Sequence, residues 1–251
     1  MYQFFVDPGA ISEKQVVITG KDVNHIKNVL RMKVGEEIAV SNGVDGREYR
    51  CGILQMTEDA VICELRFIKE DGVELPSKIY LFQGLPKADK MELIIQKAVE
   101  LGAYEIVPGA TKRAVVKLDA KKEKSKLARW QAISEAAAKQ SKRAVIPQVH
   151  SVMSFAQALA YADMLDVRLI PYEMAEDMAK TRSLIEEIRP GQSIGIFIGP
   201  EGGFAPEEIE QAMAHAAQPI TLGKRVLRQK PAGMTVLSIL MYTLEGQELK
   251  A

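Results

Sequence analysis

The chain has 251 residues, of which 47% are hydrophobic and 26% charged, and its 33 basic and 33 acidic residues cancel to a formal net charge of zero. These proportions are typical of a globular protein and exclude collagen-like and low-complexity chains. No apolar run approaches the length of a membrane span, and the first residues lack the basic and apolar regions of a signal peptide, so we expect a cytoplasmic protein.

Residues 1–72 are predicted to form a small β-rich domain. Short strands are predicted near 4–6 and at 16–18, 37–40, 47–53 and 60–67, with glycine-containing turns between them. Between the second and third strands, apolar residues at 23, 26, 29 and 30 predict a single amphipathic helix over 22–31. A small barrel with one helix suits an accessory domain that binds RNA. The polar segment Lys69–Pro76, which contains Gly and Pro, predicts the linker to a second domain at 73–251.

The second domain begins with a predicted strand, helix and strand at 79–82, 88–101 and 104–107. Two strands joined by a crossover helix indicate a βαβ unit, so we expect a parallel sheet. Further on, the spacing predicts helices over 125–140, 155–161 and 183–188, a strand at 167–170, and a last helix that begins at Pro231. We interpret Trp130 as a packing residue rather than a base-stacking platform, because it recurs with other apolar residues at helical spacing.

The stretch 194–227 contains two short strands that each end in glycine. Ile194–Ile198 is followed by GPEGGF, and Pro219–Leu222 is followed by Gly223. Ligands of open α/β sheets bind outside the carboxyl ends of the strands, so the two turns predict two walls of one crevice. The glycines match neither the dinucleotide fingerprint nor a Walker A loop, and simple chain reversal is the alternative. The cationic Lys224, Arg225 and Arg228 that follow favour a ligand site.

The neutral total charge conceals a segregation of charge along the chain. Residues 112–143 contain eleven Lys or Arg and three acids, whereas residues 163–215 contain eleven acids and four Lys or Arg. A neutral protein with one basic segment can bind a polyanion. For the run Lys121–Lys126, a solvated helix face is the favoured alternative. Cys51 and Cys63 lack CxxC spacing and the three histidines lie far apart, so we expect neither a disulfide framework nor a metal site.

The GPEGGF loop, the segment LGKRVLR and the final helix resemble the C-terminal signature of the SPOUT methyltransferases. Within that superfamily, the chain resembles the small-subunit ribosomal RNA methyltransferase E family, which methylates N3 of uridine in 16S ribosomal RNA. Strings similar to the family pattern also occur at 25–34, 97–102, 113–117, 129–130, 135–143 and 146–147. The resemblance therefore spans essentially the whole chain.

This resemblance implies an α/β fold with two domains. A small PUA-like, RNA-binding β-barrel at 1–72 would precede a SPOUT methyltransferase domain at 73–251, with a parallel sheet and a C-terminal trefoil knot. It implies S-adenosylmethionine (SAM) as the cofactor, 16S ribosomal RNA in the 30S subunit as the partner, and a homodimer. No membrane or metal partner is expected.

The resemblance also assigns roles to individual residues. The expected cofactor-binding residues are Ile170, Pro171, Gly199, Pro200, Glu201, Gly202, Gly203, Leu222, Gly223, Val226 and Leu227. The expected RNA-binding residues are Arg31, Lys33, Lys87, Lys112, Lys142 and Arg143, although Arg31 is equally compatible with pinning a loop. Arg113 and Arg228 are the candidates for catalytic stabilisation of charge on the uracil carbonyl oxygens. Glu201 is interpreted as a helix cap or ribose ligand rather than as the general base.

One segment departs from the family pattern. After Leu227-Arg228 the family has Thr-Glu-Thr-Ala, whereas this chain has Gln229-Lys230-Pro231-Ala232, so that a cation replaces an acid. The departure leaves open a second hypothesis, a knotted RNA-binding or ribosome-assembly protein that has lost methyl transfer. A third hypothesis, a nucleotide-dependent α/β enzyme unrelated to RNA, fits the glycine loops but neither the basic segment nor the barrel.

Overall fold

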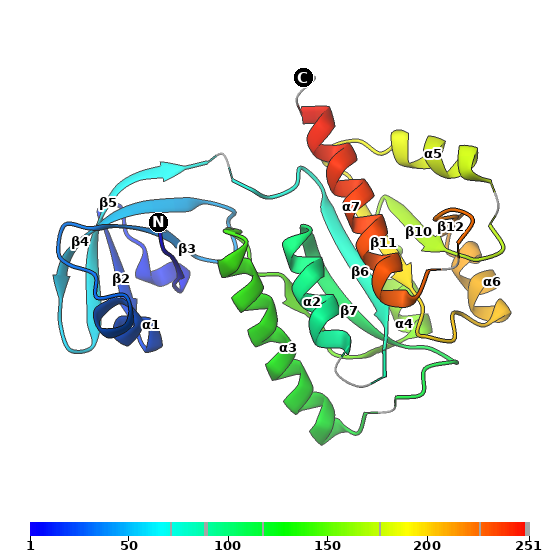
Figure 1. The fold of residues 1–251 in the computed structure, drawn as a ribbon, viewed down its shortest axis with the longest axis horizontal. Helices are drawn as coiled ribbons and strands as arrows, with labels where there is room; N and C mark the ends of the chain where they lie inside the picture. Colours follow the sequence, from blue (N-terminus) through cyan, green and yellow to red (C-terminus); the bar gives the residue numbers. More distant parts are fainter. Residues whose placement is uncertain (71, 88–89, 117, 176, 226, 249–251) are drawn as a thin grey trace. The chain divides into compact units, whose positions relative to one another are not determined.

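The computed structural model describes residues 1–70, 72–87, 90–116, 118–175, 177–225 and 227–248. The chain forms two compact units (Figure 1). The first consists of Met1–Glu74 together with Ala138–Ile146, and the second of Leu75–Ala137 together with Pro147–Ala251. The sequence analysis did not anticipate the segment 138–146 in the first unit, because its distant partners leave no periodic pattern in the sequence.

The first unit contains a five-stranded sheet in the order β1-β3-β4-β5-β2. Its strands are β1 (Gln3–Phe5), β2 (Gln15–Thr19), β3 (Glu37–Ser41), β4 (Glu48–Met56) and β5 (Ala60–Lys69), and a short 3₁₀ helix, η1, spans Pro8–Ala10. β1 pairs with β3 in parallel, and the other described pairs are antiparallel. β1 and β2 therefore lie at the opposite edges of this sheet.

The helix predicted over 22–31 is not regular. α1 (Lys21–Asn24) continues as a π-helical segment, η2 (His25–Val29), in which the Leu30 amide donates to the His25 carbonyl oxygen at 2.9 Å. The wider turn buries Ile26 completely and leaves Val29 60% exposed. The prediction of a single helix here is confirmed over 21–29, but its second half is π-helical and it ends before Arg31, which adopts a left-handed conformation with φ of 54°.

A buried ion pair holds the segment 138–146 in the first unit. Arg143 is only 3% exposed, and its Nε donates to Glu74 Oε2 at 3.1 Å. Glu74 Oε1 also accepts hydrogen bonds from the backbone amides of Ala144 and Val145 at 3.1 and 3.2 Å. The predicted RNA contact of Arg143 is not supported by this geometry, because its guanidinium is enclosed and paired within the unit.

The second unit contains a seven-stranded sheet, and all its pairings are parallel, which confirms the predicted sheet. Its main path is β12-β10-β11-β6-β7-β8, with β9 beside β7. The strands are β6 (Lys78–Gly84), β7 (Ala103–Ala110), β8 (Gln148–Val149), β9 (Met153–Ser154), β10 (Val167–Pro171), β11 (Ser193–Ile198) and β12 (Gln218–Ile220). Because helices cover both faces, β6 is buried from Ile79 to Gly84.

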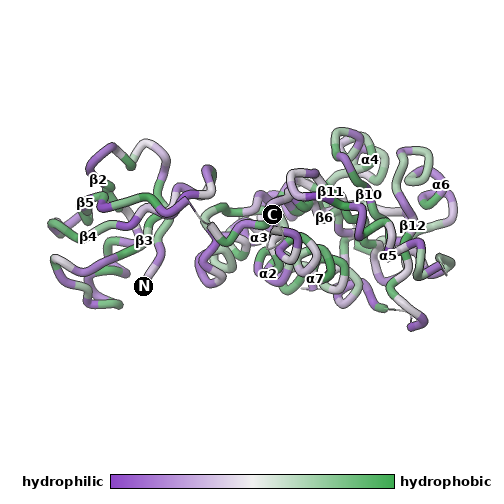
Figure 2. Tube along the Cα trace, turned by 90° about the horizontal axis from the view of Figure 1, so that it is seen from above, coloured by the Kyte–Doolittle hydropathy of each residue, from purple (hydrophilic) through white to green (hydrophobic). Residues whose placement is uncertain are grey.

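The helices of the second unit are α2 (Lys90–Glu100), α3 (Ala120–Gln140), α4 (Phe155–Ala162), α5 (Met178–Glu186), α6 (Pro206–Ala214) and α7 (Gln229–Glu248), although α3 from Ala138 onward is assigned to the first unit. α2 and α7 lie on one face of the sheet and α4 on the other (Figures 1 and 2). Two predicted starts shift. α7 begins at Gln229 rather than Pro231. α5 begins at Met178 rather than Ser183, because the Asp177 side chain caps this helix by accepting a hydrogen bond from the Lys180 amide at 2.9 Å.

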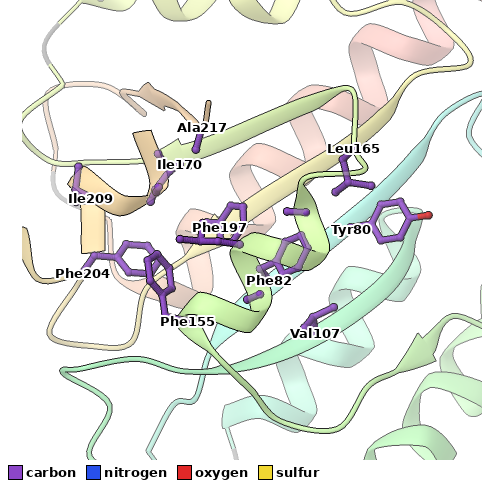
Figure 3. Close-up of a cluster of buried hydrophobic side chains, with 14 residues drawn as sticks. Tyr80, Phe82, Val107, Phe155, Leu165, Ile170, Phe197, Phe204, Ile209 and Ala217 are labelled. Carbon is purple, nitrogen blue, oxygen red and sulfur yellow. The ribbon is translucent and has the colours of Figure 1, made fainter. Parts of the chain in front are cut away.

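An aromatic core joins the sheet to α4 and α6 (Figure 3). The rings of Phe82 and Phe197 stack with centroids 4.4 Å apart, and Phe155 contacts both Phe197 and Phe204. Phe204 thus anchors the end of the GPEGGF loop in the core. Trp130 is 3% exposed, which confirms its packing role. Within the described part of the chain, no helix is both long enough and apolar enough to cross a membrane.

Candidate cofactor and substrate site

A cavity of about 630 Å³ opens at the carboxyl ends of β10, β11 and β12. Its three walls are the segments 171–173, 198–204 and 221–225, and the start of α7 closes it. Each wall follows directly from a strand of the parallel sheet, because the carboxyl ends of parallel strands meet at one edge. The structure thus brings together the two predicted glycine turns and the third turn that the resemblance implied.

The GPEGGF wall is packed too closely for side chains at two glycines. A Cβ on Gly84, at the end of β6, would lie 2.7 Å from the Pro200 nitrogen, and a Cβ on Gly199 would lie 3.1 Å from the Gly203 carbonyl carbon. Gly203 has φ of 68°, and its amide donates to the Pro200 carbonyl at 2.9 Å, which closes the turn. The close packing and the turn therefore fix the backbone of this loop, whose residues line the cavity.

The other two walls are joined by one backbone hydrogen bond, and a second hydrogen bond ties one of them to α5. The Tyr172 amide donates to the Ile220 carbonyl at 3.0 Å, and the Thr221 amide donates to the hydroxyl of Thr181, on α5, at 3.0 Å. Gly223, with φ of 105°, then turns the chain toward the cationic segment. The result is a pocket with backbone polar groups on its walls and the apolar Leu222 and Leu227 in its lining.

Most of the predicted cofactor residues line this cavity, although their contact with a cofactor stays a prediction. The lining includes Pro171, Gly199, Pro200, Glu201, Gly202, Gly203, Leu222, Gly223 and Leu227. Ile170 does not line it, because the side chain is completely buried in the aromatic core (Figure 3). Val226 lies outside the described residues.

Glu201 points its carboxylate at the connection between β6 and α2. Its Oε1 accepts from Lys90 Nζ at 2.7 Å and from the Lys87 backbone amide at 3.1 Å. Burial raises the pKa of Glu201, but the hydrogen bonds and the charge of Lys90 outweigh burial and hold the pKa below its ordinary value. A carboxylate engaged in this way stays ionised and ties the loop to the adjoining segment.

The segment after β7 contacts the GPEGGF loop from the other side. Arg113 Nη1 donates to the Gly202 carbonyl oxygen at 2.9 Å, and the exposed Lys112 pairs with Glu207 at 3.3 Å. Glu208 is buried and accepts from the Lys112 amide at 2.8 Å. Sequence reasoning assigned Glu207 and Glu208 only to a helix start, and the Glu-rich first turn after Pro206 was the available signal.

Cations gather around the mouth of the cavity. Of the predicted catalytic pair, Arg228 lines the cavity itself and Arg113 lies beside its wall. The lining also contains Lys90, Lys224, Arg225 and Lys230. Of the predicted RNA-binding residues, Lys87 and Lys112 are exposed in the second unit and Arg31, Lys33 and Lys142 are exposed in the first.

A buried pair of amides lies under the start of α7 and was not predicted. Gln83 Nε2 donates to the Gly84 carbonyl oxygen at 3.0 Å and to Gln229 Oε1 at 3.4 Å. Gln83 is completely buried and Gln229 is 7% exposed. Gln229, the first residue of the departure from the family pattern, is therefore built into the floor of the site. Its pairing with a residue far away in sequence left no local signal.

Comparison with known proteins decides the family. Residues 73–241 match the RNA methyltransferase domain family, and residues 18–66 match the RNA methyltransferase PUA domain family. The chain is 38% identical over 231 residues to Ribosomal RNA small subunit methyltransferase E of Bacillus subtilis, covering 91% of this chain and 90% of that protein. The chain belongs to the ribosomal RNA small subunit methyltransferase E family.

Solved structures of similar proteins agree with this assignment. Ribosomal RNA small subunit methyltransferase E from Neisseria gonorrhoeae, bound to S-adenosyl methionine, is 29% identical with a TM-score of 0.81, covering 96% of this chain and 97% of that chain. A putative methyltransferase from Legionella pneumophila, in complex with the cofactor SAM, is 30% identical with a TM-score of 0.80, covering 96% of each chain.

Proposed function

We propose that this protein transfers a methyl group from SAM to N3 of a uridine in 16S ribosomal RNA of the small ribosomal subunit, in the cytoplasm. The observation that carries the proposal is the cavity of about 630 Å³, formed by three strand-end loops in a chain whose structural relatives hold SAM. Its volume lies in the range of typical cofactor sites. The cations around its mouth suit a polyanionic substrate.

The residues of the cavity fit SAM. The backbone of Gly199–Gly203 and of Leu222–Gly223 offers amides and carbonyls to polar groups of the cofactor, while Leu222 and Leu227 provide apolar surface for its adenine ring. When bound, SAM supplies an electrophilic methyl group.

The chain's own residues then act on the uridine. N3 carries a proton, which passes to solvent water, and its loss places negative charge on the flanking carbonyl oxygens of the base. Arg228, in the lining, and Arg113, beside the wall, are the cations suited to stabilise that charge. Glu201 is held by Lys90 and Lys87, so its role is to position the loop.

We also propose that the second unit is threaded as a trefoil knot and that two copies form a homodimer through α7 and α2. Tyr242 on α7 is 81% exposed and Leu93 on α2 is 38% exposed, which leaves apolar surface on both helices uncovered. Sedimentation should give the mass of a dimer. Tyr242→Glu should shift the mass toward the monomer if these helices form the interface.

The alternative is a ribosome-assembly protein that binds RNA and has lost methyl transfer. The replacement of the family's acid by Lys230 at the cavity favours it. Both the methyltransferase and the assembly protein would bind RNA, but only the methyltransferase would transfer methyl groups.

Calorimetric titration with SAM, followed by methyl transfer to small subunits that lack the modification, separates them. We expect binding, and N3-methyluridine in the digested 16S RNA. Binding of SAM without transfer would favour the assembly protein. No binding would show that the three loops serve another purpose.

A further inference from the structure

Glu208 is a buried carboxylate in the first turn of α6 whose two oxygens serve two different segments. It is 6% exposed. Oε2 accepts from the Ala205 amide, and Oε1 accepts from the Lys112 amide, each at 2.8 Å. A buried charge is costly unless it is hydrogen-bonded, so both bonds are needed to hold the carboxylate in place.

The two segments are the two sides of the candidate site. Ala205 follows the GPEGGF loop, and Phe204 and Ala205 are both buried, so this side is held by the core. Lys112 lies in the connection after β7, which has no regular secondary structure and leaves Arg113 exposed. The connection therefore depends on individual contacts for its position.

Helix capping explains only half of this arrangement. In a capping box, a Glu at the third helical position accepts from the N-cap amide, and the N-cap side chain returns a bond. The N-cap residue here is Ala205, which has no side-chain acceptor to return that bond. The bond of Glu208 to Lys112 lies outside the helix and joins residues 96 positions apart.

The contact between Arg113 and the loop depends on the same register. Arg113 Nη1 reaches the Gly202 carbonyl at 2.9 Å, and a Cβ on Gly202 would lie 3.4 Å from the Arg113 Cβ. An ion pair between Lys112 and Glu207 also joins the two sides, but both side chains are more than half exposed. An exposed pair of this kind contributes little.

We propose that Glu208 is a positioning residue for methyl transfer, which sets the register of the Lys112–Arg113 segment against the cofactor loop and thereby places Arg113 over the site. The proposal rests on the proposed function. It predicts that loss of Glu208 acts through Arg113, so that turnover falls while the cofactor walls, held independently by the core, still bind SAM.

The test compares Glu208→Gln with Glu207→Gln, a matched change on the exposed side of the same helical turn. For each variant, SAM affinity is measured by calorimetry, and kcat and KM are measured with unmodified small subunits. We expect Glu208→Gln to lower kcat roughly tenfold or more, the effect of losing one charge-assisted hydrogen bond, with a much smaller change in SAM affinity. Glu207→Gln should stay close to the wild type.

A double-mutant cycle with Arg113→Ala separates positioning from general structural damage. If Glu208 acts through Arg113, the double variant should be no slower than the slower single variant. Additive losses, or parallel losses of kcat and SAM affinity, would overturn the proposal.

Should Glu208→Gln not fold, Glu208→Asp keeps the charge but is too short to serve both amides, and the same criteria apply to it. An inactive wild type would instead refute the proposed function.

Discussion

Arg113 Nη1 lies 2.9 Å from the carbonyl oxygen of Gly202, so a residue expected to act on the substrate also rests on the cofactor loop. Arg113→Ala removes both the cation and this bond. We expect kcat to fall roughly ten- to a hundredfold, because one oriented cation is lost from the transition state, and SAM affinity to fall much less. Arg113→Lys keeps the positive charge but lacks the planar guanidinium, so its kcat should lie between those of the wild type and Arg113→Ala. Equal losses of kcat and SAM affinity would remove the catalytic role.

Side chains at Gly199 and Gly202 of the cofactor loop should interfere with SAM binding. In Gly199→Ala the new methyl would lie 3.1 Å from the Gly203 backbone, and in Gly202→Val the side chain would crowd Arg113 and fill the approach to the backbone. We expect Gly199→Ala to weaken SAM binding at least roughly tenfold and Gly202→Val to abolish it, both measured by calorimetry. Gly246→Ala, on α7 with open space around its Cβ, is the control and should leave the affinity unchanged. Wild-type affinity in Gly202→Val would refute the assignment of this loop.

Lys230 adds a positive charge to the lining of the cavity. In Lys230→Glu, which restores the acid of the family pattern, we expect weaker binding of small subunits, with the slope of log affinity against log salt reduced by roughly one to two. SAM affinity should change little. Filter binding at several salt concentrations measures the slope, and an unchanged slope would show that Lys230 does not face RNA.

Glu105 makes the stability of the second unit depend on pH. Burial raises its pKa, but hydrogen bonds from His150 at 2.8 Å and Tyr161 at 2.7 Å outweigh burial and hold the pKa below its ordinary value. A carboxyl group whose pKa is lower in the folded state contributes stability above its unfolded pKa and loses it as the pH falls through the folded pKa. Glu105→Gln should therefore destabilise the protein at neutral pH, and progressively less as the solution is made acidic.

Urea unfolding of Glu105→Gln at a series of pH values measures this difference. Glu210→Gln, on the exposed side of α6, is the matched control. A destabilisation by Glu105→Gln that is constant with pH would contradict the role of the carboxylate.

Arg143 and Lys142 are adjacent basic residues with different expected roles. Arg143→Ala leaves Glu74 without its buried partner, so we expect a loss of about 3–5 kcal/mol in the free energy of unfolding of the first unit. Lys142→Ala, at an exposed position, should leave stability within about 0.5 kcal/mol and lower RNA affinity. Chemical denaturation and filter binding check the pair. A stable Arg143→Ala with weakened RNA binding would restore the original assignment.

The sequence predicted the elements that have a local signal. The periodicity of 88–101 and 125–140 predicted α2 and α3, and the buried run before GPEGGF predicted β11. Because parallel strands end at one edge, the two glycine turns were also placed correctly in one cavity.

Features set by distant partners were missed. The π-helical turn at 25–29 has the same apolar spacing as an ordinary helix, and the burial of Arg143 depends on Glu74, 69 positions away. The roles of Glu208 and of the Gln83–Gln229 pair likewise depend on partners that no periodicity reports.

Segment 138–146 belongs to the first unit although it follows residues 75–137 of the second unit in sequence, and this order matters for biosynthesis. Arg143, Ala144 and Val145 of that segment donate hydrogen bonds to Glu74, and the Ile146 amide donates to the Gly43 carbonyl oxygen at 3.0 Å. The N-terminal unit therefore cannot complete these contacts until Ile146 has left the ribosome, by which time β6, α2, β7 and α3 have also emerged. The two units should therefore complete folding together on the nascent chain. An N-terminal fragment that ends at residue 72 would lack segment 138–146 of the first unit.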